Sequence, residues 1–541
     1  MLRLSNLSLP LDYTEASLRA LILKKLGLKE EHLISCVLSR RSVDARNKSD
    51  VHFVLSVDLE VKNEAALIKR NKSLVPVERR LLPALPAPRF SRPPLVVGAG
   101  PAGLFCALTL ARAGANPVLI ERGKPVDART ADVARMTESG ILDEESNVQF
   151  GEGCAGAFSD GKLTCGVKSP YLRDVLETFV AHGAPERILI DPKPHIGTDR
   201  LKPVVASIRK EIIALGGTVC FETRLEELIL RNGRTAGAVV SCRGEKREIL
   251  SDTVLLCIGH SARDTVRSLF RSGVRMERKP FAMGVRIEHP RELIDRSQYG
   301  SFAGHPKLEA ATYKLTCHTA DGRGVYTFCM CPGGHVIAAA SEAEGVVVNG
   351  MSYHARDAEN SNAALLVGVR PEDFGGDHPL AGFELQRKIE QAAWLAANGT
   401  EGRSPRSNLS FLAPAQRVED FLNGRETVRF GEVRPSYRPG VIPADLRAVL
   451  PDFIVDNLKL AIPVLDRQLK GFALPDAVLT APETRSSSPV RLPRDASGQA
   501  EGIAGLYPVG EGAGYAGGIV SAALDGIQAA RSALENAGSR S

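Results

Sequence analysis

Apolar and polar residues alternate along the first part of the chain in a way that predicts a small α/β domain. Strand-like alternation appears three times, the last time over Val51 to Lys62. Helical spacing of apolar residues follows Thr14, a good N-cap, up to Leu26, and appears again over Asn63 to Lys72. This β-α-β-β-α order predicts a ferredoxin-like plait over residues 1–89.

A different pattern begins after Pro83 to Pro94, a proline-rich stretch that we interpret as a linker. Leu95 to Val97 is a short apolar strand. A glycine turn, a helix of small residues over Ala102 to Ala113 and a second strand ending at Glu121 follow it. This stretch predicts the first β-α-β unit of a parallel sheet covered by helices.

The turn of this unit carries the G-x-G-x-x-G spacing of a dinucleotide site. Gly98 permits the tight turn, Gly100 lets backbone approach a pyrophosphate, and Gly103 lets the helix pack close to the strand. The helix N-terminus offers N–H groups and partial positive charge to phosphates. Glu121 ends the second strand, where an acid can accept both ribose hydroxyls. The alternative, a membrane span over the uncharged Leu95 to Ala111, is too short and too rich in glycine.

Two further glycine-rich stretches interrupt the apolar pattern. Gly151 to Cys165 (GEGCAGAFSDGKLTC) cannot pack a core, so we expect it to lie against a cofactor with its N–H groups turned inward. Lys162 in this loop is a candidate cation for a flavin or a substrate carboxylate, although a plain surface turn is the alternative. Near the C-terminus, a strand meets the turn Gly510 to Gly518, which carries Glu511 and precedes a small-residue helix. Two such turns, far apart in the sequence, suggest one ligand that is held by both. Tight binding of this kind suits FAD better than NAD, which exchanges freely.

The region from Ser261 to about Pro493 is the least patterned. It contains several strand-like pieces and helices near Phe383 to Ala397 and Ala444 to Gly471. Cys329 and Cys331 alternate along one strand, so both are expected on one side. A redox pair is conceivable, but a C-x-C disulfide is strained, and two thiols in a strand is the simpler interpretation.

The composition of the chain narrows the class of protein. At 541 residues the chain needs several domains, and 43% hydrophobic and 24% charged residues are ordinary for a globular protein. The net charge of +6 suggests anionic ligands more than a dedicated nucleic-acid binder. The 10 cysteines lack C-x-x-C or zinc spacing, which predicts a reduced compartment and no metal site. No signal-peptide pattern is evident, so we expect a cytoplasmic protein without a membrane partner.

Together these motifs resemble a family of uncharacterised FAD-dependent dehydrogenases with a characteristic C-terminal domain, in the glutathione-reductase-like FAD superfamily. The resemblance covers essentially the whole chain, and its carriers are VVGAGPAG with IERG, GEGCAGAFSDGKL, FAMGVRIEHP, TFCMCPGG, ETRSSSPVR and YPVGEGAGYAGGIVSAALDG. It implies a Rossmann-like FAD/NAD(P)-binding domain with ββα three-layer architecture. That domain would comprise residues 90–275 and 494–541, interrupted by an α+β substrate domain at 276–493.

The resemblance also implies site residues. Leu225 would offer backbone atoms to adenine, and Glu511 would meet the ribityl chain although many relatives carry Asp there. The full set expected to bind FAD is Gly98, Gly100, Pro101, Ala102, Gly103, Glu121, Arg122, Arg129, Gly156, Leu225, Gly259, Gly510, Glu511, Gly517, Gly518 and Ile519. No second G-x-G-x-x-G motif in a βαβ setting is present, so NAD(P)H would act only as a transient electron donor.

The first functional hypothesis is therefore an FAD-dependent oxidoreductase acting on a small anionic substrate. Lys162 and Arg485 are the leading catalytic candidates. Arg286, His318 and His335 are weaker ones. An alternative is a flavoprotein that binds or modifies RNA through basic residues between two N-terminal strands, Arg40, Arg41, Arg46 and Lys48. Another is a non-catalytic flavin redox sensor in which Cys154 or the Cys329/Cys331 pair responds to oxidants.

Overall fold

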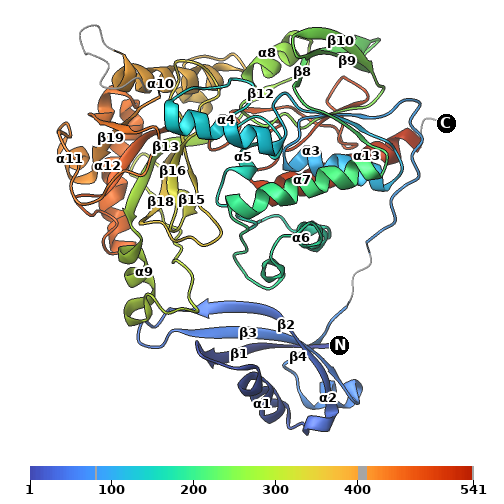
Figure 1. Cartoon of the computed structure of the whole chain (residues 1–541), viewed down its shortest axis with the longest axis vertical. Coiled ribbons are helices and arrows are strands. Elements are labelled where there is room, and N and C mark those ends of the chain that lie inside the picture. Colours follow the sequence, from blue (N-terminus) through green and yellow to red (C-terminus); the bar gives the residue numbers. More distant parts are fainter. Residues whose placement is uncertain (79–81, 400–410, 539–541) are drawn as a thin grey trace.

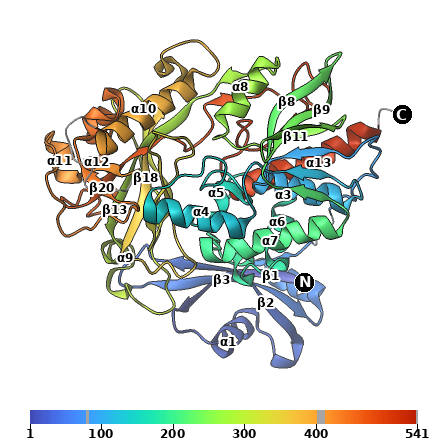
Figure 2. The same ribbon diagram turned by 45° about the horizontal axis from the view of Figure 1, so that its top comes forward.

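The computed structural model describes residues 1–78, 82–399 and 411–538. The chain forms an N-terminal domain, a Rossmann-like domain built from two separate stretches, and an inserted domain between those stretches. In Figure 1 the N-terminal domain (blue) lies below the other two domains. The turned view of Figure 2 shows α3, α13 and α7 lying together beside the inserted domain. Among the described helices, none combines the length and apolarity that crossing a bilayer requires.

The N-terminal domain has the predicted element order and one further strand. Its elements are β1 (Leu2–Pro10), α1 (Glu15–Leu26), β2 (Leu33–Asp44), β3 (His52–Val61), α2 (Glu64–Arg70) and β4 (Leu74–Pro76). The sheet order is β2-β3-β1-β4, with antiparallel neighbours, which is the arrangement of a ferredoxin-like plait. Thr14 caps α1 as predicted, because its hydroxyl accepts from the Ser17 amide at 3.2 Å.

The basic residues of this domain are placed differently from the prediction. Arg40 and Arg41 lie within β2 and not in the loop after it. The strand runs on to Asp44 because β3 pairs with it to that point, a long-range pairing that the local pattern does not contain. Arg46 pairs with Asp44, and the Lys48 ammonium donates to the Gln298 carbonyl of the inserted domain.

The Rossmann-like domain is built on a parallel sheet of order β23-β11-β5-β6-β7. These strands are Leu506–Pro508, Val254–Leu256, Leu95–Val97, Val118–Ile120 and Thr218–Cys220, in that order. The chain moves outward from β5 in one direction and later continues on its other side with β11. Ligands of such sheets bind where the strand order reverses, at the carboxyl ends of the strands.

Helices pack on one face of this sheet, and a small antiparallel sheet together with one helix packs on the other face. The helices are α3 (Pro101–Arg112), α4 (Val126–Ser139), α5 (Cys154–Ala157), α6 (Leu172–Ala181), α7 (Thr198–Ala214), α8 (Arg263–Arg271) and α13 (Ile519–Gly538). The small sheet comprises β8 (Thr223–Arg231), β9 (Arg234–Cys242) and β10 (Glu245–Leu250). Leu225 therefore lies inside β8. The helices α3 and α13 pack so closely that a Cβ added to Gly526 would approach the Ala102 carbonyl oxygen to 2.2 Å.

The inserted domain begins and ends at a two-stranded neck. The strands β12 (Glu277–Arg278) and β22 (Val490–Arg491) pair antiparallel there. The predicted limits at residues 276 and 493 lie just outside this pair. The remaining small sheet is β16 (His335–Ala338) with β17 (Val348–Met351).

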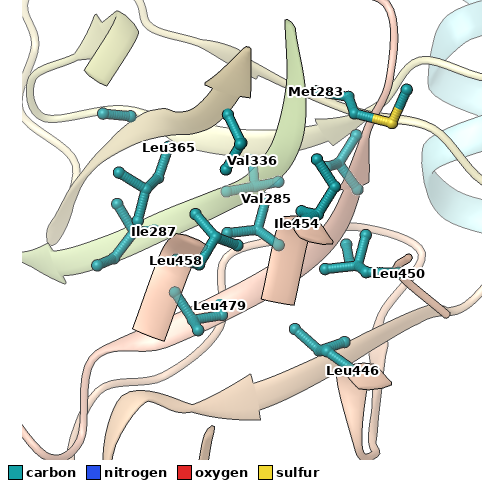
Figure 3. Close-up of a cluster of buried hydrophobic side chains, with 14 of the residues drawn as sticks. Met283, Val285, Ile287, Val336, Leu365, Leu446, Leu450, Ile454, Leu458 and Leu479 are labelled. Carbon is teal, nitrogen blue, oxygen red and sulfur yellow. The ribbon is translucent and has the colours of Figure 1, made fainter. Parts of the chain in front are cut away.

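A seven-stranded sheet of order β14-β15-β18-β13-β21-β19-β20 forms the centre of the inserted domain. Its strands are Thr316–His318, Gly324–Cys331, Asn360–Val369, Phe281–Pro290, Val478–Glu483, Ala413–Arg417 and Val441–Pro443. The helices around it are α9 (Arg291–Tyr299), α10 (Ala381–Asn398), α11 (Val418–Asn423) and α12 (Asp452–Gln468). Figure 3 shows Ile454 and Leu458 of α12 packed towards Val285 of β13, in a cluster of fully buried side chains. The predicted helix over Ala444 to Gly471 starts only at Asp452, because Pro451 precedes it in an extended conformation.

Candidate functional site

The predicted dinucleotide turn joins β5 to α3, and contacts at its glycines exclude side chains. Gly98 has φ +102°, and a Cβ there would approach the Cys257 carbonyl oxygen to 2.4 Å. A Cβ on Gly103 would lie 1.8 Å from the Gly98 carbonyl oxygen. Gly100 precedes Pro101, the first residue of α3, and no side chain caps this helix N-terminus. The turn therefore leaves the N-terminus of α3 available for an anion.

The glycine-rich loop predicted to face the cofactor lies against this turn. The Gly153 amide donates to the Ala99 carbonyl at 2.8 Å. Gly156 is placed between Pro101 and Ile519, since a Cβ there would contact both at 3.3 to 3.4 Å. The loop thus connects the N-terminus of α3 with that of α13, as a shared polar cradle requires.

Cys154 shapes the same cradle. Its backbone has φ +45°, an uncommon conformation for a residue with a side chain, and its sulfur would lie 3.1 Å from a Cβ on Gly100. Burial raises the pKa of the thiol well above its usual range, so the group is neutral at physiological pH.

Arg129 was predicted to bind the cofactor, but the structure gives its guanidinium a different partner. All five N–H donors are used within the loop itself. Their acceptors are the carbonyls of Asn147, Val148, Gly151, Glu152 and Cys154, at 2.7 to 3.4 Å. Since the side chain is fully buried, Arg129 organises the loop and has no donor left for a phosphate.

Glu121 is buried and already accepts three backbone hydrogen bonds. Oε2 accepts from Ala99 at 2.7 Å, and Oε1 accepts from Gly123 at 3.0 Å and Gly151 at 2.9 Å. A carboxylate offers about four lone-pair positions, so room remains for a ribose hydroxyl beside these three bonds. Glu121 therefore fixes the dinucleotide turn and the glycine loop relative to each other.

A small cleft opens beside Glu121 at the carboxyl ends of β5 and β6. Four predicted residues line it: Gly98, Glu121, Arg122 and Leu225. The sequence reasoning missed Phe150, Arg224 and Thr265, which also line it. The Arg122 guanidinium lies 4.0 Å from the Phe150 ring centroid and pairs with Glu145 at 2.8 Å and Asp264 at 2.9 Å. Aromatic and planar cationic groups of this kind suit an adenine base.

The second predicted nucleotide segment folds back onto the first. The Gly510 amide donates to Asp525 at 2.6 Å. A Cβ on Gly512 would lie 2.2 Å from the carbonyl oxygen of Gly259. At Gly517 and Gly518, which precede α13 and Ile519, nothing lies within 4 Å of an added Cβ. The space before the α13 N-terminus is therefore open.

Glu511, in the same turn, and His260 lie near each other, and both have perturbed pKa values. Burial raises the pKa of Glu511 to about 7, with Lys279 opposing the shift. Burial lowers the pKa of His260 to about 3, and Arg485 and Arg263 add to that shift. His260 Nε2 lies 3.8 Å from Glu511 Oε1. Sequence reasoning did not select His260, although it directly follows Gly259 at the end of the strand region.

Lys162 lies at the junction of the glycine loop and the inserted domain. Its ammonium is 3.4 Å from Asp160, whose carboxylate also pairs with Arg356. Nζ is buried and has no hydrogen-bond acceptor among the described residues. Burial raises the pKa of Cys331, and Lys162 acts against that shift. The cation therefore faces the end of β15.

The other catalytic candidates are held in structural contacts. Arg485 is buried and pairs with Glu390 through two bonds at 2.9 and 3.1 Å. Arg263 binds the same carboxylate at 2.7 Å. Arg286 is fully buried against Glu483.

Among the residues that the structure describes, neither histidine candidate has a partner that suggests proton transfer. His318 is exposed on the edge strand β14, and His335 packs edge-on against Tyr353 at 6.2 Å. Burial lowers the pKa of His335.

The C-x-C pair is not on one side of a regular strand. The register of β15 shifts between Phe328 and Cys331, and Cys329 has φ +39°. Cys331 is buried and donates to the Cys329 carbonyl at 3.2 Å, whereas Cys329 is exposed. A bulge breaks the alternation, so the prediction of a shared face was wrong. Within the described residues, no group of three or more His, Cys, Asp or Glu could hold a metal ion.

Comparison with known families agrees with this site. A family model described as an FAD binding domain matches residues 94–134, and one described as "FAD-dependent protein, C-terminal domain-like" matches residues 280–486. A domain of unknown function matches residues 1–60. The cradle of glycines and the cleft beside Glu121 fit the cofactor that these matches specify. The protein is therefore an FAD-dependent oxidoreductase.

An uncharacterised protein from Clostridium beijerinckii is 46% identical over 539 residues, which cover 99% of this chain and 98% of that protein. The chain belongs to this family of FAD-dependent proteins.

Solved structures with similar regions are much more distant. Quinol fumarate reductase FrdA from E. coli is 14% identical, with a TM-score of 0.36 over 83% of this chain and 71% of its own. Pyridoxine 4-oxidase from Mesorbium loti is 14% identical, with a TM-score of 0.33 over 82% and 99%. Glycerol-3-phosphate dehydrogenase from Bacillus halodurans, complexed with FAD, is 15% identical, with a TM-score of 0.26 over 51% and 48%. Similarities this low do not bear on the substrate.

Proposed function

We propose that this protein transfers a hydride between FAD and a small anionic substrate, and that Lys162 binds the substrate anion. One observation carries the proposal: the Lys162 ammonium is buried, yet its nitrogen has no hydrogen-bond acceptor among the described residues. Leaving such a group without an acceptor is costly, and an anionic ligand would supply one. Asp160 does not fully meet this need, because Arg356 and Ser352 also bind its carboxylate.

The position of Lys162 supports a place near the flavin. A Cβ added to Gly156 of the same loop would contact both Pro101 and Ile519, the first residues of α3 and α13. Gly98, Gly100 and Gly103 would hold the pyrophosphate, Glu121 the ribose, and the open turn at Gly517 and Gly518 the flavin end. When bound, the flavin would supply the hydride chemistry, and the protein would position the substrate. The parallel sheet order and the β8-β9-β10 sheet support placing the chain in the glutathione-reductase-like superfamily.

The first test is the absorbance spectrum of the purified protein, taken anaerobically before and after addition of NADH or NADPH. Rapid bleaching would identify a nicotinamide donor and direct the search to substrates that accept the hydride. A spectrum that stays oxidised would direct it to substrates that deliver their own hydride. Small carboxylates and inorganic phosphate would then be titrated while the flavin spectrum is recorded.

The Lys162→Gln variant is expected to weaken binding of such anions at least about tenfold, a typical cost of losing a charge-assisted bond in a buried site. Its FAD content should stay at the wild-type level, because Lys162 is placed outside the nucleotide cradle. Lys168→Gln is the matched control, since Lys168 belongs to the segment that follows the loop and is exposed. Equal anion affinity in wild type and Lys162→Gln would refute the assignment.

FAD affinity is expected to fall as pH rises through 7. Glu511 has a pKa of about 7 without ligand, and a nearby anionic ligand would raise that pKa further, so FAD binding takes up a proton. Below pH 7 the carboxyl is protonated in both states and affinity is constant. Above it, affinity drops by up to about tenfold per pH unit until the pKa of the complex is reached. Glu511→Gln should flatten this profile in fluorescence titrations of apoprotein with FAD, and an unchanged slope would contradict the placement of Glu511.

A further inference from the structure

The N-terminal domain docks on two segments of the rest of the chain. Tyr299, Phe302 and Leu308 of the inserted domain pack against its hydrophobic core. Lys307 donates to the Tyr13 carbonyl at 3.3 Å. On the other side, β2 contacts the end of the 3-10 turn Glu186–Leu189 of the Rossmann-like domain. Figure 1 shows the strands of this domain directly below α9 of the inserted domain and α6 of the Rossmann-like domain.

Arg41 makes the contact with the Rossmann-like domain. Its backbone amide donates to the Ile190 carbonyl at 3.0 Å, and its guanidinium lies 3.3 Å from Asp191. Asp191 also pairs with Arg187 at 2.7 Å, and Arg187 pairs in turn with Glu309. Arg41 is therefore engaged inside the molecule, which removes part of the basic surface behind the RNA hypothesis.

Glu309 connects this contact to the candidate substrate site. It directly follows Leu308, which touches the N-terminal core, and it lies 3.7 Å from Arg356. Arg356 binds both oxygens of Asp160, at 3.0 and 2.5 Å, and Asp160 is the ion-pair partner of Lys162. The side chains of Arg356 and Asp160 are only 5% and 3% exposed, so water screens this pair little. Burial alone would raise the pKa of Asp160, but Lys162 and Arg356 lower it well below its usual range.

A backbone route runs in parallel with these ion pairs. Lys162 forms an isolated β-bridge with His195, through bonds from Leu163 to Pro194 at 2.9 Å and from Ile196 to Gly161 at 3.0 Å. The same segment begins at Ile190 and Asp191, where Arg41 binds. Pro192 and Pro194 lie between the two contacts and restrict the backbone. A displacement at Ile190 would therefore be transmitted to the backbone around Lys162.

We propose that docking of the N-terminal domain holds Lys162 in place. Arg41, Glu309 and Arg356 are the residues that position the Lys162 side chain. The link is reciprocal: an anion bound by Lys162 stabilises the docked domain, and release of the domain frees Lys162. A macromolecule that competes for β2 would thus weaken anion binding. That consequence for substrate rests on the proposed function, whereas the placement of Lys162 by the docked domain does not.

The test measures the chemical reactivity of Lys162 in the full-length, FAD-loaded protein. The protein is treated briefly with a limiting amount of acetic anhydride, and acetylation of Lys162 is quantified by mass spectrometry. Hydrogen exchange of β2 and of residues 299–308 reports in parallel whether the domain is docked. The variants are Arg41→Ala, Leu308→Asp and the two combined, so that release is reached even if one contact suffices for docking. Arg40→Ala is the matched control, because Arg40 is the neighbouring residue on β2 and is exposed.

Release of the domain is expected to raise Lys162 acetylation about fivefold or more, the lower end of typical coupling between sites. Arg40→Ala should match wild type, and Arg41→Lys should recover part of the protection. Acetylation at the wild-type rate in the combined variant, with exchange showing a released domain, would overturn the proposal. A failure of Lys162→Gln to weaken anion binding would refute only the substrate role, since this labelling experiment needs no substrate.

Discussion

Replacing Gly103 by valine is expected to abolish FAD binding. A Cβ at this position would lie 1.8 Å from the Gly98 carbonyl oxygen and 3.3 Å from the Cys257 Cβ. The first contact is with the backbone of the dinucleotide turn. That backbone is fixed by a hydrogen bond that the Gly98 amide donates to the Ile120 carbonyl at 2.8 Å. The start of α3 must therefore move away from β5, and the N–H groups that should receive the pyrophosphate move with it.

The FAD-to-protein ratio after desalting, read from the absorbance spectrum, should fall at least about tenfold, because close approach of backbone to the pyrophosphate is lost. Gly166→Val is the matched control, since an added Cβ there meets nothing within 4 Å. Circular dichroism would establish that the rest of the chain folds in both variants. A stoichiometric FAD content in Gly103→Val would show that the turn at Gly98 to Gly103 is not the cofactor site.

Replacing Glu390 by alanine is expected to cost about 3–5 kcal/mol of stability, the range for removing one partner of a buried ion pair. Glu390 is buried between two buried arginines: Arg263 of the Rossmann-like domain and Arg485 at the return from the inserted domain. Removal of the carboxylate leaves two guanidinium groups with uncompensated charge. Chemical unfolding would measure the loss. Glu384→Ala on the same helix removes an exposed pair with Arg267 and should cost less than about 1 kcal/mol.

The pH dependence of stability offers a second readout for Glu390. Burial would raise its pKa, but Arg263 and Arg485 lower it far below the ordinary value of 4.5. A carboxyl group with a lowered folded-state pKa contributes stability above its unfolded pKa and loses it as pH falls. Wild type should therefore lose stability below about pH 4.5 more steeply than Glu390→Ala. If the stability of both proteins changed with pH in parallel, Glu390 would not be an ionised group that stabilises the fold.

Local patterns predicted the nucleotide unit well because its determinants lie close together in the sequence. The turn from Gly98 to Gly103, the strand before it and the helix after it depend on steric contacts within a few residues. The same holds for the Thr14 cap and the alternating strands of the N-terminal domain. The glycine-rich loop, with its four glycines among small residues, lies against the dinucleotide turn.

The charged residues were predicted less well, since an arginine has the same local signature whatever it binds. Arg129 was expected at the cofactor, but it faces a loop whose five carbonyls take every donor. Arg485 was expected at the substrate, but its carboxylate partner lies 95 residues away in the sequence. His195 and His260 belong to no sequence motif, so only their neighbours in the folded structure identify them as residues near the candidate site.

The sequence by itself determined the Rossmann-like unit, the FAD cofactor and the plait at the N-terminus, because backbone sterics and apolar periodicity act over short stretches. Only the tertiary structure decided which acids and bases meet. Arg41 reaches Asp191 across 150 residues, and Lys162 lies 3.4 Å from Asp160, whose carboxylate also binds Arg356 of the inserted domain. Charges act through the groups opposite them, and long-range packing alone brings those groups within reach.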